Sequence, residues 1–260
     1  MNEAERMEKD RKFVYALGRG LDILKAFSPD EAELSNLELS EKTGLPKPTV
    51  SRFTYTLTEL GYLVTAPRTG KYRLGPLVLS LGYTMLASVD LRERAKPFMD
   101  DIARRDHVTV ALGTRDKLSA VYIEVSKGSQ IITISRNVGS RLPIHNTAMG
   151  KALIAALPAT EYQYLLKALA EKFPEDIRAI EKSLETARED IETQGFCTSI
   201  GEWIKDVNAV AAPLFSADRN EIYAINVGGP SFMINQERLC EELGPRLVDV
   251  VKALTPSALT

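Results

Sequence analysis

The 260-residue chain has few of the residues that build metal centres or disulfide frameworks. Its two cysteines, Cys197 and Cys240, lie far apart without a CxxC motif, and its two histidines, His107 and His145, are isolated. This spacing predicts neither a metal site nor structural disulfides. Residues 1–11 are charged and lack the apolar stretch of a secretory signal, so we expect a reducing, cytoplasmic location.

Long hydrophobic runs and enzyme motifs are also missing. The apolar stretch 74–91 is broken by glycine, proline and hydroxyl residues and is too polar to span a membrane. The chain has no serine elbow, paired-carboxylate signature or phosphate-binding loop, so we expect no enzyme, no catalytic residue and no cofactor. His145 is read as structural, and Lys151 is expected to be solvated.

Charge is low overall but unevenly distributed. Hydrophobic residues make up 44% and charged residues 26% of a chain with net charge −2, which is typical of a soluble globular protein of one large or two smaller domains. Residues 42–73, however, carry six Lys/Arg against the single acid Glu59, a net charge of +5. A local basic segment on a near-neutral protein favours nucleic-acid binding over membrane binding.

The segment 45–61, LPKPTVSRFTYTLTELG, predicts an amphipathic helix. Two prolines suit its first turn, and Val50, Phe53, Leu57 and Leu60 recur at helical spacing. The other face is small, hydroxylated and basic, which suits a DNA major groove. It carries Lys47, Thr49, Ser51, Arg52 and Tyr55. Taken alone, the segment could equally be an ordinary surface helix.

The flanking segments favour DNA binding. An apolar stripe predicts a helix over 17–27, and a Ser35-x-x-Glu38 capping box begins a short helix that ends near Gly44. After Gly61, residues 62–65 and 71–74 predict two strands joined by a turn, with Arg68 and Lys71 as cations of this wing. Helix, helix, reader helix and wing make a winged helix-turn-helix, whereas the alternative is a small helical bundle with a hairpin.

The remainder predicts a linker helix and a second domain. Apolar residues Leu77, Leu81, Met85 and Val89 need a partner, either the chain's own wing domain or a second copy, and we favour the copy. Beyond residue 91, strands are expected at 109–113, 119–125, 131–136, 195–200, 207–215 and 222–227, and helices at 91–105, 149–157, 160–171, 177–194 and 235–254. This order is typical of an α+β domain with an antiparallel sheet. We expect a DNA-binding domain at 1–75, a linker at 76–90 and a second domain at 91–260.

Five blocks together resemble the IclR family of bacterial transcriptional regulators. They are LPKPTVSR at 45–52 with GY at 61–62, GKYRLG at 70–75, VGSRLPIH at 138–145, MGKALIA at 149–155 and VAAP at 210–213. The resemblance implies a winged helix-turn-helix domain and a GAF-like α/β effector domain. It also implies homodimers, or dimers of dimers, that bind palindromic double-stranded DNA and respond to small organic acids, often aromatic.

The motif HNTAMGK at 145–151 predicts a helix start that Asn146 or Thr147 caps. Free N–H groups at Ala148, Met149 and Gly150 would seat a carboxylate, although a plain structural helix start is the alternative. The family resemblance maps effector contacts onto Ala148 and Met149, and onto Ser199, Ala209, Asn226 and Gly228. Because these side chains are small or neutral, we expect a roomy pocket and an aromatic acid. Trp203 is either a lid or an interface residue.

Two other functions stay open at this point. The protein could be an enzyme or sensor whose winged helix makes only protein contacts, or a DNA-binding scaffold without a small-molecule ligand. The basic segment argues against the first, and ligand binding would exclude the second.

Overall fold

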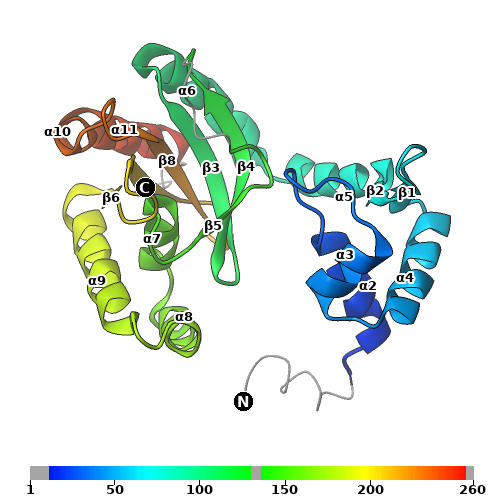
Figure 1. Ribbon diagram of the computed structural model, residues 1–260. Coiled ribbons are helices and arrows are strands. Elements are labelled where there is room, and N and C mark those ends of the chain that lie inside the picture. The colour runs from blue at the N-terminus through cyan, green and yellow to red at the C-terminus, as the bar shows by residue number, and fades with distance from the viewer. Residues whose placement is uncertain (1–11, 130–135, 256–260) are drawn as a thin grey trace. The chain divides into compact units, whose positions relative to one another are not determined.

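The computed structural model describes residues 12–129 and 136–255, and the chain divides between Ser88 and Val89 into two compact units (Figure 1). The first unit contains α2 (Tyr15–Lys25), α3 (Asn36–Thr43), α4 (Lys47–Glu59), β1 (Leu63–Thr65), β2 (Tyr72–Leu74) and α5 (Pro76–Ala87). The second contains α6 (Asp90–Asp106), β3 (Thr109–Asp116), β4 (Ser119–Lys127), β5 (Arg141–Pro143), α7 (Ala148–Ala155), α8 (Ala159–Lys172), α9 (Ile177–Gln194), β6 (Cys197–Ile200), β7 (Val207–Phe215), β8 (Ile222–Pro230), α10 (Gln236–Arg238) and α11 (Gly244–Leu254).

The first unit is the winged helix-turn-helix that the sequence predicts. Ser35 Oγ accepts a hydrogen bond from Glu38 N at 3.3 Å, and a Glu38 carboxylate oxygen accepts one from Ser35 N at 2.7 Å, so the capping box is present. Gly44 ends α3 in the left-handed conformation at φ +68°, which a glycine adopts without a Cβ clash. β1 and β2 pair antiparallel as the wing.

Its core differs in part from the predicted apolar stripes. In α2, Leu17 and Leu21 are exposed, whereas Ile23 is fully buried and Gly20 allows the Phe53 ring to approach. In α4, Leu60 is 58% exposed because it follows the last helical residue, and Thr54 takes the buried position instead. A periodicity count could not choose between adjacent faces of α2, since both carry apolar side chains.

The second unit is an antiparallel six-stranded sheet in the order β5-β4-β3-β8-β7-β6. Helices α7, α8 and α9 cover one face through two clusters of buried residues, and α6 and α11 pack against the other (Figure 1). The register of β4 shifts between Tyr122 and Glu124, where a bulge places these two side chains on opposite faces. Tyr122 joins the α7 side, and Glu124 pairs with Arg92 of α6 at 2.6 Å.

Three segments of this unit differ from the sequence prediction or lie outside the described residues. The expected strand 131–136 lies outside the described residues except for Arg136. Strand β5 carries no sequence signal and exists through pairing with β4. The single helix expected over 235–254 is broken by a π-helical turn, Leu239–Leu243, because Pro245 has no N–H for a regular helical ladder.

Helix α5, all of whose residues are described, has no buried residue. Its apolar side chains Leu79, Leu81 and Tyr83 are 74%, 56% and 65% exposed. Packing against its own wing domain therefore does not cover this helix.

Candidate functional site

Helix α4 presents a polar surface opposite its buried side. Val50 and Thr54 are fully buried, while Lys47, Ser51, Arg52 and Tyr55 are exposed and Thr49 is half-buried. These exposed residues are the ones that the sequence predicts for base and phosphate contact. Among the described residues, no carboxylate pairs with Lys47 or Arg52, so both cations are available to an anionic partner.

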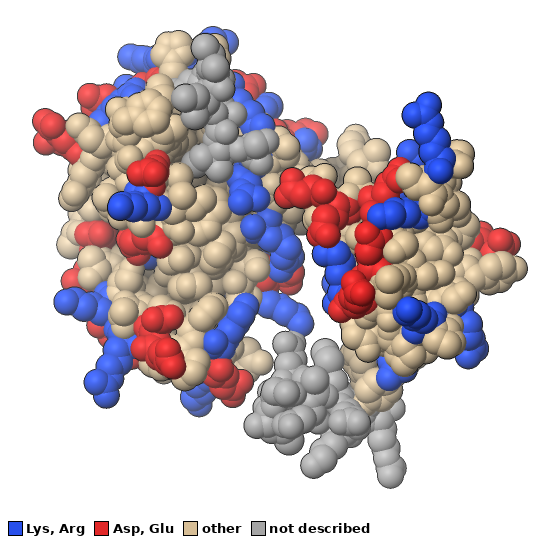
Figure 2. All heavy atoms as spheres, viewed as in Figure 1, with Lys and Arg blue, Asp and Glu red and all other residues tan. Residues whose placement is uncertain are grey.

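The basic segment is partly neutralised by acids from earlier in the chain. Lys42 pairs with Glu31 at 2.6 Å and Lys71 pairs with Glu38 at 2.8 Å. Hydrogen bonds from Lys71 and Ser35 lower the pKa of Glu38 to about 2, so its carboxylate stays charged. Figure 2 accordingly shows acidic and basic side chains interspersed over the visible face of this unit. Arg68 and Arg73 remain without an acidic partner in the described part of the chain.

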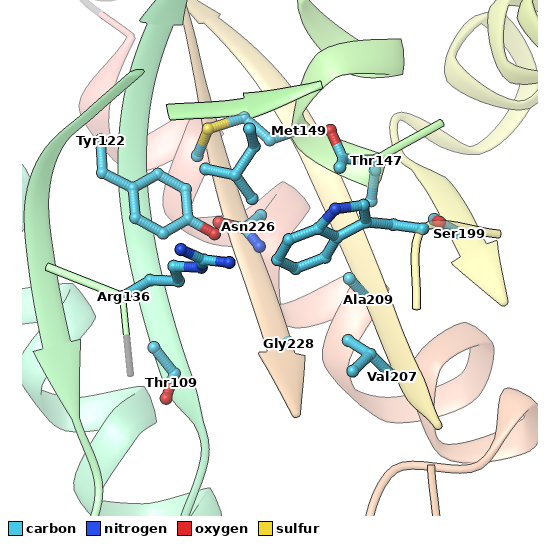
Figure 3. A pocket seen from close by; sticks show the side chains of 13 residues that line it. Thr109, Tyr122, Arg136, Thr147, Met149, Ser199, Val207, Ala209, Asn226 and Gly228 are labelled. Atoms are coloured by element: carbon cyan, nitrogen blue, oxygen red, sulfur yellow. The ribbon is translucent and has the colours of Figure 1, made fainter. Parts of the chain in front are cut away.

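The second unit contains a cavity between the start of α7 and the sheet (Figure 3). Its empty volume is about 560 Å³, part of which is open to solvent. It is lined by Thr109, Tyr122, Arg136, Leu142, Thr147, Ala148, Met149, Ser199, Trp203, Val207, Ala209, Asn226 and Gly228.

The floor of the cavity exists because small residues meet across three strands. Gly228 of β8 lies opposite Ala209 of β7 and Thr109 of β3. A Cβ on Gly228 would stand 3.4 Å from Ala209 Cβ and would begin to fill the space. The roomy pocket expected from these residues and the class of its effector both stay predictions.

Arg136 and Trp203 complete the cavity from the sides. Arg136 lies with its guanidinium carbon 5.5 Å from the centre of the Trp203 ring, a cation–π arrangement. Trp203 thus lines the cavity, which supports the lid among the two roles considered for it.

Several polar groups at the start of α7 are bonded within the protein, whereas Asn146 Oδ1 is buried without a partner among the described residues. Thr147 caps the helix: its Oγ1 accepts from Gly150 N at 3.1 Å and donates to the Pro143 carbonyl at 2.7 Å. Ser199 Oγ donates to the Asn146 carbonyl at 2.9 Å. The prediction of a free N–H at Gly150 is therefore wrong.

Gly150 is also not among the described residues that line the cavity. A Cβ at this position would lie 2.1 Å from the Ile144 carbonyl oxygen, so the glycine serves the close approach of α7 to the preceding loop.

The polar groups on the opposite side are also buried. Burial raises the pKa of Tyr122 to about 12, against the opposing effects of a hydrogen bond from Asn226 and the charge of Arg136. Asn226 is 7% exposed, and its Oδ1 has no hydrogen-bond partner among the described residues. Figure 3 shows the ends of Tyr122, Asn226 and Arg136 directed toward one another.

Behind the cavity, the expectation of a solvated Lys151 is wrong. Lys151 is 4% exposed, and its ammonium contacts Glu202 Oε1 at 2.5 Å and Ser183 Oγ at 3.4 Å. Because Glu202 precedes Trp203, this ion pair ties the loop that carries Trp203 to α7. His145 instead packs on the Phe173 ring at 4.5 Å, where burial lowers the pKa of its imidazole.

Two other kinds of feature are missing from the described ranges 12–129 and 136–255. No three His, Cys, Asp or Glu side chains there group as metal ligands. No helix there is long and apolar enough to cross a membrane. Cys197 is buried, which raises the pKa of its thiol to about 12.

Comparison with known proteins decides the family. Residues 16–67 match the IclR helix-turn-helix domain, and residues 83–255 match the bacterial transcriptional regulator IclR C-terminal domain. The chain belongs to the IclR family of bacterial transcriptional regulators.

Individual members of the family resemble it along most of their length. The HTH-type transcriptional regulator TsaQ1/TsaQ2 of Comamonas testosteroni is 32% identical over 94% of this chain and 88% of its own. The HTH-type transcriptional regulator XynR of Escherichia coli is 32% identical over 82% and 85%. The crystal structure of an IclR-family regulator from Brucella abortus superposes with a TM-score of 0.83, at 43% identity over 95% of this chain and 93% of that one. This IclR-family protein is therefore a DNA-binding transcriptional regulator.

Of the sequence-predicted effector residues, Ala148, Met149, Ser199, Ala209, Asn226 and Gly228 meet at one cavity. The sequence missed Tyr122 and Arg136 as lining residues, and it left Trp203 between a lid and an interface role. Tyr122 faces the α7 side next to the β4 bulge, and Arg136 lies between β4 and β5 in the sequence. The bulge has no local sequence signal, and the strand predicted at 131–136 did not indicate where the Arg136 side chain points.

Proposed function

We propose that this IclR-family regulator controls catabolic genes in response to a small carboxylic acid, most simply an aromatic one, bound in the cavity of the second unit. The observation that carries the proposal is the character of that cavity: a largely apolar lining with one cation, Arg136, and no acid among its described residues. Such a lining suits a ligand with an apolar body and a single negative charge.

DNA recognition is assigned to α4 and the wing. Lys47, Arg68 and Lys71 neutralise phosphates and set the register, whereas Thr49, Ser51, Arg52 and Tyr55 face the base edges. Replacing Arg52 with alanine should cost roughly 1–3 kcal/mol of operator binding and relax base preference. Arg104→Ala, an exposed arginine of the other unit, is the control. An unchanged affinity and footprint for Arg52→Ala would remove Arg52 from the interface.

Helix α5 is assigned to pairing between two copies. Its exposed apolar residues have no cover within the chain, and a two-fold pair would set two reader helices on successive major grooves of a palindrome. A dimer of dimers would extend the same arrangement. Because the target is bacterial chromosomal DNA, we place the protein in the cytoplasm, with no role for a membrane.

The effector is assigned to the space bounded by Ala148, Met149, Ala209 and Gly228, with Ser199 and Asn226 at its edges. Trp203 is the only tryptophan of the chain and lines this space, so its fluorescence reports binding directly. The test is a titration of the purified protein with benzoate, 4-hydroxybenzoate and phenylacetate, beside glyoxylate and pyruvate.

A saturable change of Trp203 fluorescence with an aromatic acid, together with a rise in Tm, would support the proposal. Binding of the two keto acids alone would overturn the aromatic class. Binding of none would favour the DNA-binding scaffold without a ligand.

A further inference from the structure

The polar side chains that line the cavity fall into two groups. Those beside α7 are used inside the protein, since Thr147 caps the helix and Ser199 bonds the Asn146 carbonyl. Those on the opposite side are not fully used, since Asn226 Oδ1 is buried without a partner. That oxygen is an acceptor and cannot bond a carboxylate, so what this side offers to an anion is the Arg136 guanidinium and the Tyr122 hydroxyl.

Arg136 stands at this incomplete side. It is half-buried, its charge acts on the Tyr122 hydroxyl, and among the described residues it pairs with no carboxylate. Its guanidinium lies over the face of Trp203, 5.5 Å from the ring centre. A guanidinium held over a ring keeps its N–H donors available for two parallel hydrogen bonds to a carboxylate.

From this arrangement we infer that Arg136, with the Tyr122 hydroxyl, holds the charged group of the effector, in preference to the N-terminus of α7. The inference rests on the proposed function and fixes the orientation of the ligand within it. The ligand's carboxylate faces Arg136 and the Tyr122 hydroxyl, and its apolar body lies toward Met149 and Ala209.

The chemistry of each side supports this orientation. The Tyr122 phenol remains protonated at neutral pH because burial raises its pKa to about 12, so it is a hydrogen-bond donor to an anion. At the other side, Gly150 N is already bonded, and the one cation of α7, Lys151, is neutralised by Glu202. Only two backbone N–H groups of an eight-residue helix, those of Ala148 and Met149, would remain there.

The test is a charge comparison with two ligands of nearly equal shape. Benzoate and its neutral amide, benzamide, are titrated by calorimetry into wild-type protein, Arg136→Met and Arg136→Lys. Arg141→Met is the matched control, because Arg141 is an exposed arginine on the cavity's edge strand that pairs with Asp116 at 2.7 Å and lies outside the lining.

We expect wild type and Arg141→Met to bind benzoate at least tenfold more tightly than benzamide. Arg136→Met should lose this preference and bind benzamide within threefold of wild type, which also shows that the cavity is intact. Arg136→Lys should recover part of the preference, since it keeps the charge without the planar fork.

The contrary results separate the orientation from the function. If Arg136→Met keeps the benzoate preference, or if wild type binds both ligands equally, the assignment of Arg136 is overturned while ligand binding stands. If wild type binds neither benzoate nor benzamide but binds other acids, the aromatic class and the orientation derived for it both fall. If wild type binds no acid at all, the proposed effector function fails as well.

Discussion

Replacing Glu202 with glutamine should destabilise the second unit more than replacing its partner Lys151 with methionine. Lys151 is 4% exposed, and its ammonium is held by Glu202 at 2.5 Å and Ser183 at 3.4 Å. Glu202→Gln leaves a buried positive charge with neutral partners. Loss of one partner of a fully buried pair costs about 3–5 kcal/mol, and because the Glu202 side chain is 35% exposed we expect about 2–3 kcal/mol.

Lys151→Met behaves differently because it removes the buried charge and keeps most of the side-chain volume. The remaining Glu202 carboxylate can turn toward water, so the expected cost is about 1 kcal/mol or less. The double variant should lie close to Lys151→Met alone, which gives a coupling of about 2 kcal/mol between the two sites.

The assay is urea unfolding followed by the fluorescence of Trp203. As the only tryptophan of the chain, it lies in the second unit and reports that unit without interference from the first. We expect lower transition midpoints with an unchanged m-value. Equal destabilisation by the two single variants, or a loss below about 0.5 kcal/mol for Glu202→Gln, would refute the reasoning that a buried cation sets the cost.

Three further predictions follow from other parts of the molecule. Glu38→Gln keeps a capping side chain but frees Lys71 from its ion pair. Operator binding measured by fluorescence anisotropy should therefore strengthen, and the slope of log affinity against log salt concentration should steepen by about one. Unchanged binding would show that Lys71 contacts no phosphate. Leu79→Asp, at a position 74% exposed, should yield folded monomers in sedimentation velocity, and intact dimers would exclude this face of α5 from pairing. Because burial lowers the pKa of His145 below its ordinary 6.5, the folded state binds this proton less readily than the unfolded state. The free energy of unfolding should therefore fall as the pH drops below 6.5, towards the lowered pKa of the folded state. His145→Gln should flatten this pH dependence, measured by unfolding followed through Trp203 fluorescence, and an unaltered dependence would contradict the reasoning.

Features of the fold that depend on neighbouring residues could be predicted from the sequence. The Ser35/Glu38 capping box, the left-handed Gly44 and the proline-led reader helix all follow from local chemistry and are present. The buried face of α2 could not be chosen, because Leu17, Leu21 and Ile23 are equally apolar and only packing against α4 decides between them.

The candidate cavity shows the same limit. Ala148 and Met149 could be placed there through a family resemblance, but the strand predicted at 131–136 gave no indication that the Arg136 guanidinium lines the cavity. The burial of Lys151 could not be predicted for a related reason. A lysine in a first helical turn is usually solvated, and its burial here depends on Glu202, 51 residues further along the chain.

The central claim is that an acid bound in the second unit changes DNA binding by the first. The most direct test is to select an operator from random DNA, then measure its Kd by anisotropy with and without a saturating acid identified by Trp203 fluorescence. The account predicts a change of roughly 5–150-fold, in either direction, that disappears when Arg136 is replaced by methionine at the same acid concentration. Equal affinity for the operator with and without the bound acid would contradict it.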